Sequence, residues 1–538
     1  MSDNIKKILI RGVNWIGDAV LTTPAIKAVH EAFPDAYICL LVKPGVADIF
    51  KENPNINEII LYDEKFNSIP GKLKLARMLR ARGFNSAILL QNAFDAALIT
   101  LLSGIPERIG YRRDWRRFLL TRAVPVSPVR KKAPSSLSNG VKKDILKQHQ
   151  VYYYLNLLKE SLNIEARDTE PFIYLNKEEI NEAKNLLNRS LDLTPETPLI
   201  GVNPGATYGS AKRWMPERFA ELISRIINEL NGKVVIFGSR SEAEIAKLLT
   251  SHPSLPASHL LNMAGKTNLR ELAALISECD VMISNDSGPM HIAAALLVPV
   301  VAIFGSTDRA ITGPFGEGHK TISKDIPCAP CFERECPVDA TRFREGHIKC
   351  MTNITTDDVF SKLQQILPKE KAVFLDRDGT LNEDVGYLNS FSNLKIFDGA
   401  RKNLQRLKKA GFRLIGVTNQ SGIARGLISE EFVMAVNSYM QKNLGIDDFY
   451  CCAHHPDNGC QCRKPKPMML LKARLKHGIN LKTSYVVGDK DLDMLLARSV
   501  GARGILVLTG IDKKSEYADF TAKNLTKAVD WILEQEKA

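Results

Sequence analysis

The sequence predicts an α/β protein made of three units, each built around a parallel sheet. Short β-branched and apolar runs alternate with helical stretches, a pattern typical of strands buried on both faces. A length of 538 residues suits three or four domains. With 44% hydrophobic and 25% charged residues, the composition excludes a wholly disordered, collagen-like or disulfide-scaffold chain.

The expected strands form three groups along the chain. In the first group, a helical stripe from Leu21 to Ala32 follows the first strand. The expected strands cover residues 8–10, 37–42, 59–61 and 87–90, then 199–202, 233–237, 281–284 and 300–304, then 372–376, 413–418, 485–489 and 505–508. We therefore expect domains at residues 1–190, 191–365 and 371–538. Residues 127–148 are basic and rich in turn formers, which predicts a flexible loop.

The charge balance points to anionic partners. Lysine and arginine total 73 against 60 acidic residues, a net charge of +13, which suits nucleic acid, phosphorylated molecules or an acidic membrane face. No basic stripe carries the interleaved aromatic residues of single-strand binders, so we expect no nucleic-acid partner. The N-terminus runs straight into a strand pattern and no apolar run reaches about 18 residues, so we expect a cytoplasmic protein.

Carboxylates follow the strands of the third group. Asp376 and Asp378 stand two residues apart after the first of these strands, which suits phosphoryl transfer: one carboxylate attacks phosphorus and the other moves a proton. Thr418 ends the next strand, Lys464 can offset phosphoryl charge, and Asp489 can complete a Mg²⁺ site. An Asp-Gly turn alone is common, but four such elements in order favour a phosphatase.

These elements resemble the haloacid dehalogenase-like phosphatases over about residues 371–530. The resemblance implies that Asp376 is the nucleophile and Asp378 the general acid and base. It implies that Thr418 and Lys464 stabilise the phosphoryl group. The implied magnesium ligands are Asp376, Asp378 and Asp489, with Asp493 beside them.

A cysteine-rich segment at residues 452–465 refines this assignment. Cys452, His454, Cys460 and Cys462 would form a closed tetrahedral zinc site, which is structural. Such a site would aim Arg463 and Lys464 into the active site. The alternative is a set of free thiols, and Cys451 and His455 leave the choice of ligands open.

Two groups of related phosphatases share such a loop, one acting on histidinol phosphate and one on D-glycero-D-manno-heptose 1,7-bisphosphate. Residues 419–426 and 384–387 are similar to the heptose group, which implies removal of the 7-phosphate and release of heptose 1-phosphate. The resemblance implies substrate contacts by Asp384, Val385, Gly386, Tyr387, Thr418, Asn419, Gln420, Ser421, Arg463, Lys464 and Lys490.

The first two units carry polar loops at strand ends. Asp18 follows the first strand and is either a helix N-cap or a base that deprotonates an acceptor hydroxyl. Residues 203–214 form a Gly-rich loop in which backbone amides and Lys212 could hold a diphosphate. Residues 284–291 open a helix whose N-terminus favours phosphate. Each loop alone could be an ordinary capped turn, with His291 in the core, but the pair favours nucleotide-sugar binding.

Over about residues 6–365 the chain resembles the family-nine glycosyltransferases, in particular the lipopolysaccharide heptosyltransferases of type II. The resemblance implies a GT-B fold of two Rossmann-like halves and an inverting transfer without an essential metal. It implies ADP-L-glycero-β-D-manno-heptose as donor and the lipid A-core at the inner membrane's cytoplasmic face as acceptor. Asp18 would be the general base and Lys212 the diphosphate contact. The implied residues around the donor are Asp286, Ser287, Gly288 and His291, with Glu242 near the ribose.

The sequence therefore predicts a bifunctional enzyme of lipopolysaccharide core assembly that uses Mg²⁺ and Zn²⁺. The alternatives are a histidinol-phosphate-type phosphatase fused to another sugar transferase, and a basic membrane or nucleic-acid scaffold with decayed sites. Two features stay open. Cys328, Cys331, Cys336 and Cys350 could bind metal or be reduced structural thiols, and the basic segment from Arg130 to Lys143 could meet anionic lipid or be a solvated loop.

Overall fold

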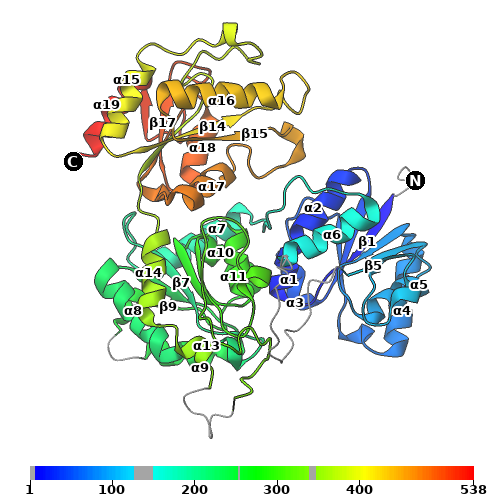
Figure 1. Ribbon diagram of the computed structural model, residues 1–538. Coiled ribbons are helices and arrows are strands. Elements are labelled where there is room, and N and C mark those ends of the chain that lie inside the picture. The colour runs from blue at the N-terminus through cyan, green and yellow to red at the C-terminus, as the bar shows by residue number, and fades with distance from the viewer. Residues whose placement is uncertain (1–5, 127–148, 252–254, 339–346, 538) are drawn as a thin grey trace, which may run out of the picture. The chain divides into compact units, whose positions relative to one another are not determined.

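The protein is built from helices layered on parallel sheets, as the computed structural model shows for residues 6–126, 149–251, 255–338 and 347–537 (Figure 1). Within these residues the strands form three six-stranded sheets, and all their pairings are parallel. Each sheet has the order 3-2-1-4-5-6 when its own strands are counted along the chain, the order of a Rossmann fold. The predicted α/β fold is confirmed.

The chain divides into two compact units. The second unit contains residues 366–538 together with 194–197, and the first contains the remainder. The predicted loop at 127–148, and with it the basic segment from Arg130 to Lys143, lies outside the described residues. In the part of the chain that is described, no helix is long and apolar enough to cross a membrane.

The first sheet lies in the N-terminal half of the first unit. Its strands are β1 (Lys7–Arg11), β2 (Tyr37–Val42), β3 (Glu58–Leu61), β4 (Ser86–Leu89), β5 (Glu107–Tyr111) and β6 (Arg122–Val124). One face is covered by α1 (Ile16–Leu21), α2 (Thr23–Ala32) and α6 (Gln150–Leu162), and the other by α4 (Ile69–Arg82) and α5 (Phe94–Leu102). Because strand side chains alternate in direction, Ile8 and Ile10 pack under the first group of helices and Leu9 under the second.

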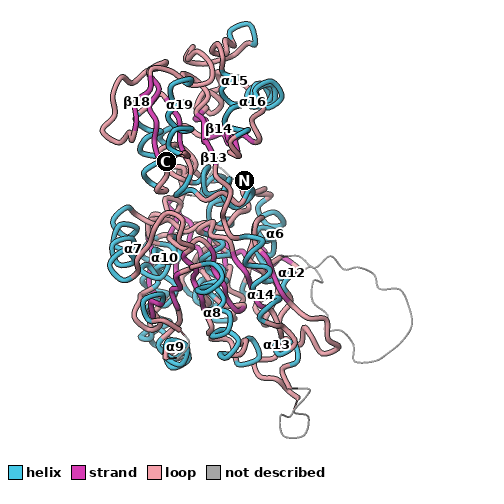
Figure 2. The backbone as a smooth tube through the Cα atoms, turned by 90° about the vertical axis from the view of Figure 1, so that its left-hand side faces the viewer, coloured by secondary structure: helices cyan, strands magenta, loops and turns pink. Residues whose placement is uncertain are grey.

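The second sheet lies in the other half of the first unit. Its strands are β7 (Leu199–Asn203), β8 (Lys233–Ile236), β9 (Leu260–Asn262), β10 (Val281–Asn285), β11 (Val300–Ile303) and β12 (Lys320–Ile322). Its helices are α7 (Lys177–Ser190), α8 (Pro216–Leu230), α9 (Ala243–Thr250), α10 (Leu269–Ser277), α11 (Gly288–Ala295), α12 (Arg309–Thr312), α13 (Lys349–Thr352) and α14 (Thr356–Ile366). The late helix α14 returns to α8 (Figure 2), where Arg225 Nη1 lies 2.7 Å from Asp357 Oδ1.

The two halves of the first unit share one continuous apolar core. Helix α7 packs against α10, where Arg270 Nη2 lies 2.6 Å from Glu179 Oε2. Helix α1 packs against α11. The loops that precede α1 and α11 therefore meet within this unit.

The third sheet forms the second unit. Its strands are β13 (Ala372–Leu375), β14 (Arg413–Asn419), β15 (Asp448–Cys452), β16 (Tyr485–Gly488), β17 (Arg503–Val507) and β18 (Phe520–Ala522). One face packs against α15 (Ala400–Lys409), α16 (Glu430–Leu444) and α19 (Leu525–Gln535), and the other against α17 (Met468–His477) and α18 (Asp491–Ser499).

Every strand that the sequence predicts is present. Among the described residues the structure has six further strands, β5, β6, β9, β12, β15 and β18. The expected helical stripe after β1 is divided at Thr22, where α1 ends and α2 begins. In each sheet the order reverses beside the first strand, at β1/β4, β7/β10 and β13/β16. Ligands bind outside the carboxyl ends of the strands at such points, which directs attention to the loops after these strands.

Candidate active sites

The second unit places carboxylates at its switch point. Asp376 follows β13, and its backbone N–H donates to Val487 in β16 at 2.9 Å. Asp489 follows β16 directly. Gly379 has a φ of +87°, and a β-carbon there would lie 2.4 Å from Asp489 Oδ2, so the turn after β13 needs glycine for both its backbone and its space.

Three of these carboxylates converge. Asp376, Asp489 and Asp493 are buried, and each offers an oxygen within 4.8 Å of the others. Lys464 Nζ lies 2.5 Å from Asp376 Oδ1 and 2.6 Å from Asp493 Oδ1. One lysine leaves two of the three negative charges unbalanced, and buried Asp489 Oδ1 has no hydrogen-bond partner within the described chain. A divalent cation held by oxygen ligands fits this set.

The electrostatics agree with a missing positive charge. Burial, and then the neighbouring Asp376, raise the pKa of Asp489 to about 7. Burial also raises the pKa of Asp493 to about 6; Lys464 opposes this rise and Asp376 adds to it. Burial alone would lower the pKa of Lys464, but Asp376 and Asp493 outweigh it, so its pKa is raised and the ammonium stays charged.

We expect Asp489→Asn to stabilise the metal-free second unit while removing its activity. The folded pKa of about 7 lies above the unfolded value near 3.9, so Asp489 favours folding at low pH and this contribution is lost as pH rises to about 7. At pH 8 the Asp489 carboxylate is ionised and is repelled by Asp376 and Asp493, whereas the neutral asparagine side chain is not. Thermal unfolding of the full chain in chelator should show a higher Tm for the second unit. An unchanged or lower Tm would contradict the charge-repulsion account.

The Asp378 carboxylate is not among the three that converge, and its role as a metal ligand stays a prediction. Its carboxylate accepts hydrogen bonds from Arg377, from Asn382 Nδ2 at 3.0 Å and from Gln420 Nε2 at 2.8 Å. Burial raises its pKa, but Arg377 and these hydrogen bonds hold the pKa below its ordinary value. The buried Arg377 guanidinium pairs with this carboxylate, with Nη2 2.9 Å from Asp378 Oδ2.

The predicted phosphate-binding residues lie at the end of β14 and in the loop that follows it. Thr418 Oγ1 accepts a hydrogen bond from Gln420 Nε2 at 2.8 Å. The Lys464 backbone N–H donates to Asn419 Oδ1 at 3.1 Å, which ties the end of β14 to the lysine. Ser421 follows in the same loop.

A second group of predicted substrate residues lies on the loop at 384–387. Lys490 Nζ lies 3.1 Å from Asp384 Oδ2, so this loop is tied to the residue after Asp489. Val385 and Tyr387 are both exposed. Arg463 keeps one buried nitrogen, Nη1, without a hydrogen-bond partner in the described residues.

The predicted zinc ligands come together. Cys452, His454, Cys460 and Cys462 each offer an atom within 4.8 Å of the others, and His454 Nδ1 lies 3.2 Å from Cys462 Sγ. Three sulfurs and one imidazole nitrogen are a donor set that fits a closed tetrahedral zinc site.

The two neighbours that had left the ligand set ambiguous lie outside this group. Cys451 alternates with Cys452 along β15 and therefore points to the other face of the strand. His455 Nδ1 lies 3.3 Å from Asp457 Oδ2 instead.

In the first unit, Asp18 lies in the first turn of α1. The N-cap of this helix is Trp15, so the N-cap interpretation of Asp18 is wrong. Asp18 Oδ1 accepts a hydrogen bond from the Tyr154 hydroxyl at 3.4 Å. Burial, together with Asp18, raises the pKa of Tyr154 well above its ordinary value, so the phenol remains a donor.

The predicted donor loops face Asp18 from the other half of this unit. A β-carbon at Gly17 would lie 2.6 Å from His291 Cδ2, so only glycine lets α1 approach this ring. Burial lowers the pKa of His291 to about 4, which keeps the imidazole neutral at physiological pH. His291 is therefore in the core, as its alternative interpretation held, and it packs against Gly17, the residue before Asp18.

Lys212 is buried against the loop that opens α11. Its Nζ lies 2.5 Å from Asp286 Oδ2, which also accepts a hydrogen bond from Thr307 Oγ1 at 2.6 Å. Ser287 is the N-cap of α11 but makes no side-chain capping bond; its Oγ accepts from Asn203 Nδ2 at 3.0 Å. In the first turn of α11, which begins at Gly288, Pro289 has no N–H and the Met290 N–H donates to the Ser287 carbonyl at 3.2 Å, so the Gly288 N–H and the helix dipole are what favour an anion here.

The Glu242 carboxylate already accepts hydrogen bonds from within its own loop. It closes a capping box with Ser239, whose backbone N–H donates to Glu242 Oε2 at 2.8 Å. Four further residues contact the predicted site residues and were not predicted from the sequence: Arg377, Asn382, Tyr154 and Thr307. The position of Arg377 between Asp376 and Asp378 could have indicated from the sequence that it lies at the site. Tyr154 lies more than 130 residues from Asp18, so nothing in the local sequence indicates their contact.

Comparison with known proteins now places the chain. The profile of Glycosyltransferase family 9 (heptosyltransferase) matches residues 72–341, half of the chain. The chain belongs to this family. It is 28% identical to lipopolysaccharide heptosyltransferase 2 of Salmonella typhimurium over 368 residues, which is 68% of this chain and 99% of that protein. The solved structure of the ADP-heptose LPS heptosyltransferase II of Escherichia coli matches with a TM-score of 0.54 at 27% identity, over 67% of this chain and 98% of that one.

The second unit has relatives of another kind. A HAD-hydrolase-like profile matches residues 461–533. The D-glycero-beta-D-manno-heptose-1,7-bisphosphate 7-phosphatase of Yersinia pestis is 42% identical over 176 residues, which is 30% of this chain and 89% of that protein. This family-9 chain is therefore a bifunctional enzyme in which a glycosyltransferase and a phosphatase share one polypeptide, and the predicted fusion is confirmed.

Proposed function

We propose that both halves of this enzyme serve lipopolysaccharide core assembly. The first unit transfers heptose from ADP-L-glycero-β-D-manno-heptose to the lipid A-core, with inversion. The second unit removes the 7-phosphate of D-glycero-D-manno-heptose 1,7-bisphosphate. The observation that carries the proposal is the pairing, in one chain, of relatives that act on heptose substrates at both steps, each with charged residues at a sheet's switch point.

In the phosphatase unit, an Asp376 oxygen attacks the 7-phosphorus and the bond from phosphorus to the sugar oxygen breaks. Asp378 gives its proton to that oxygen, and heptose 1-phosphate leaves. Water then attacks the aspartyl phosphate and passes a proton to Asp378, which releases phosphate and restores Asp376. Asp378 is held ionised in the free site; the incoming phosphate dianion favours its protonated form, which the first step requires.

The other polar groups hold the phosphoryl oxygens and the sugar. Lys464, Thr418 and Asn419 face the phosphorus that Asp376 attacks. Arg463, with its unpartnered nitrogen, binds an anionic group of the bisphosphate. Asp376 and Asp489, with Asp493 beside them, would hold Mg²⁺, and the ion would supply positive charge against the phosphoryl oxygens.

The zinc site orients the loop that carries Arg463 and Lys464, because Cys460 and Cys462 immediately precede them. We expect Cys460→Ser to lose one zinc per chain and about tenfold or more in phosphatase kcat/KM, a typical cost of disturbing the surroundings of a metal site. Heptosyl transfer by the same preparation is the internal control and should be unchanged. Retained zinc would remove Cys460 from the ligand set.

In the transferase unit, Asp18 takes the proton of the acceptor hydroxyl, whose oxygen attacks the anomeric carbon of the heptose. The bond from that carbon to the diphosphate breaks on the opposite side, which inverts the centre and releases ADP. Lys212 and the positive end of the α11 dipole offset the diphosphate charge. Asp286 and Thr307 hold Lys212 in place until the donor arrives.

The acceptor would be met at the cytoplasmic face of the inner membrane by peripheral contact, for which the net charge of +13 offers attraction to anionic headgroups. Two product analyses test the proposal. Mass spectrometry should show one heptose added to a core acceptor, with one ADP released per transfer. Phosphorus NMR should show loss of the 7-phosphate signal and retention of the 1-phosphate. Transfer of a different sugar, or loss of the 1-phosphate, would contradict it.

A further inference from the structure

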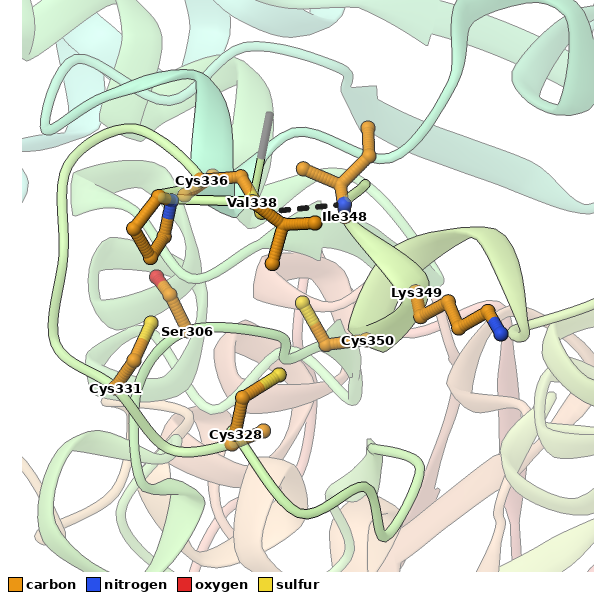
Figure 3. Close-up of a pocket in the computed structure, with 11 residues that line it drawn as sticks. Ser306, Cys328, Cys331, Cys336, Val338, Ile348, Lys349 and Cys350 are labelled. Atoms are coloured by element: carbon orange, nitrogen blue, oxygen red, sulfur yellow. Dashed lines mark hydrogen bonds between the residues drawn. The ribbon is translucent and has the colours of Figure 1, made fainter. Parts of the chain in front are cut away.

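Four cysteines in the first unit surround a small cavity that the proposed chemistry does not use. Cys328, Cys331, Cys336 and Cys350 line it together with Ser306 and Lys349, and its volume is about 30 Å³. Figure 3 shows the four side chains grouped around this space, three from one loop and Cys350 from α13. Protein interiors leave few voids of this size, and this one has room for a single bound atom.

The cysteines are suited to ligate a metal ion. All four are free thiols. The Ile348 backbone N–H donates to Cys336 Sγ at 3.3 Å (Figure 3), an outer contact of the kind that orients a metal-bound thiolate. The sulfurs stand farther apart than the zinc-site ligands at Cys452 to Cys462, since they do not fall within a mutual 4.8 Å among the described residues. Binding of one ion would have to draw these sulfurs closer together.

We propose that Cys328, Cys331, Cys336 and Cys350 bind one thiophilic divalent cation, Zn²⁺ or Fe²⁺, in a tetrathiolate site. Binding releases the thiol protons and needs no redox partner. Four thiolates and no open position make the site structural.

The segment from Cys331 to Cys336 is hydrogen-bonded to the Gly-rich loop at 203–214, which is part of the proposed donor site. The Ala211 backbone N–H donates to the carbonyl of Arg334 at 3.0 Å, and the Tyr208 hydroxyl donates to the carbonyl of Phe332 at 3.0 Å. The Tyr208 ring lies beneath Lys212 Nζ, 4.5 Å from its centroid. The metal therefore fixes the segment from Cys331 to Cys336, which in turn positions Lys212. This consequence rests on the proposed donor site, whereas metal binding itself does not.

Metal content per chain tests the site directly. The full-length protein, purified without added metal and treated with a mild chelator to remove Mg²⁺, should hold two thiolate-bound ions, one here and one at Cys452 to Cys462. Cys331→Ser and Cys336→Ser should each hold one ion, and the double variant Cys331→Ser/Cys460→Ser none. Cys279→Ser removes a buried thiol far from both clusters in sequence and should keep two.

The identity of the ion and the role of the site need separate readouts. Elemental analysis of the bound ions separates zinc from iron. As a second readout, an iron tetrathiolate that has been oxidised to Fe³⁺ absorbs visible light by charge transfer, whereas a zinc site does not. Cys331→Ser should raise the KM for the ADP-sugar about tenfold with a smaller change in kcat, a cost of ~1.4 kcal/mol in donor binding. Phosphate release by the same sample reports that the chain is folded.

Three results would overturn the proposal. One is a single ion per wild-type chain that Cys460→Ser removes entirely. Another is an unchanged metal content in Cys331→Ser. If both serine variants fail to fold, Co²⁺ titration of metal-stripped wild-type protein decides instead: one cobalt ion per chain with thiolate charge-transfer absorption, rather than two, would refute the site. A loss of one ion in Cys331→Ser with an unchanged donor KM would keep the metal and refute its positioning role.

Discussion

Asp376→Asn should abolish phosphate release while heptosyl transfer continues at the wild-type rate. The amide cannot act as the nucleophile, and removal of a covalent nucleophile lowers kcat by about 10⁴-fold or more. The Asp376 carboxylate is buried beside Lys464 and Asp489. The other two carboxylates of the converging group, Asp489 and Asp493, follow β16 and not β13, so neither stands where Asp376 does. Phosphate release under Mg²⁺ and ADP release from the donor, measured on one preparation, check both halves.

The matched control is Asp398→Asn, which changes an exposed aspartate of the same unit. It should leave both rates unchanged. If the folded Asp376→Asn protein loses both activities, the claim of two independent sites fails. If it keeps phosphate release, the nucleophile is another residue.

Asp18→Asn should have the reverse effect, with heptosyl transfer reduced about 10² to 10⁴-fold, the usual contribution of a general base. The amide keeps an oxygen that can accept the hydrogen bond from Tyr154, so α1 should keep its packing. The measurement is the initial rate of ADP release in the presence of acceptor, with phosphate release as the folding control. The loss should appear in kcat more than in the donor KM, because Asp18 acts on the acceptor.

The control for this variant is Asp35→Asn, an exposed aspartate in the same half. Undiminished transfer by Asp18→Asn would show that its carboxylate only serves the packing of α1. A large rise in the donor KM with unchanged kcat would also contradict the base assignment.

The buried strands were predictable because each is a run of apolar residues, such as residues 37–42 in β2. The strands that sequence reasoning missed are mainly the outer ones. β9 and β18, for example, have three residues each, too few to establish a period, and their pairing depends on a neighbour distant in sequence. The exact start of α1 was also out of reach, since Trp15 is not a residue type that marks an N-cap.

The candidate sites show the same division. Asp376 and Asp489 could be placed because they end strands of one parallel sheet, which fixes their edge. The direction of the Asp378 carboxylate could not, because it depends on the buried Arg377 and on Gln420 from another strand end. The approach of Gly17 to His291 depends on packing between two helices more than 270 residues apart.

The most direct test of the central claim is phosphate release with Mg²⁺ from four substrates: both anomers of D-glycero-D-manno-heptose 1,7-bisphosphate, histidinol phosphate and a generic sugar phosphate. We expect the heptose bisphosphates to give a kcat/KM at least about tenfold above that of the other two substrates, since their second phosphate offers an anionic group to Arg463 and their sugar can meet the loop at 384–387. Preference for histidinol phosphate would contradict the account, because the two units would then no longer share a sugar.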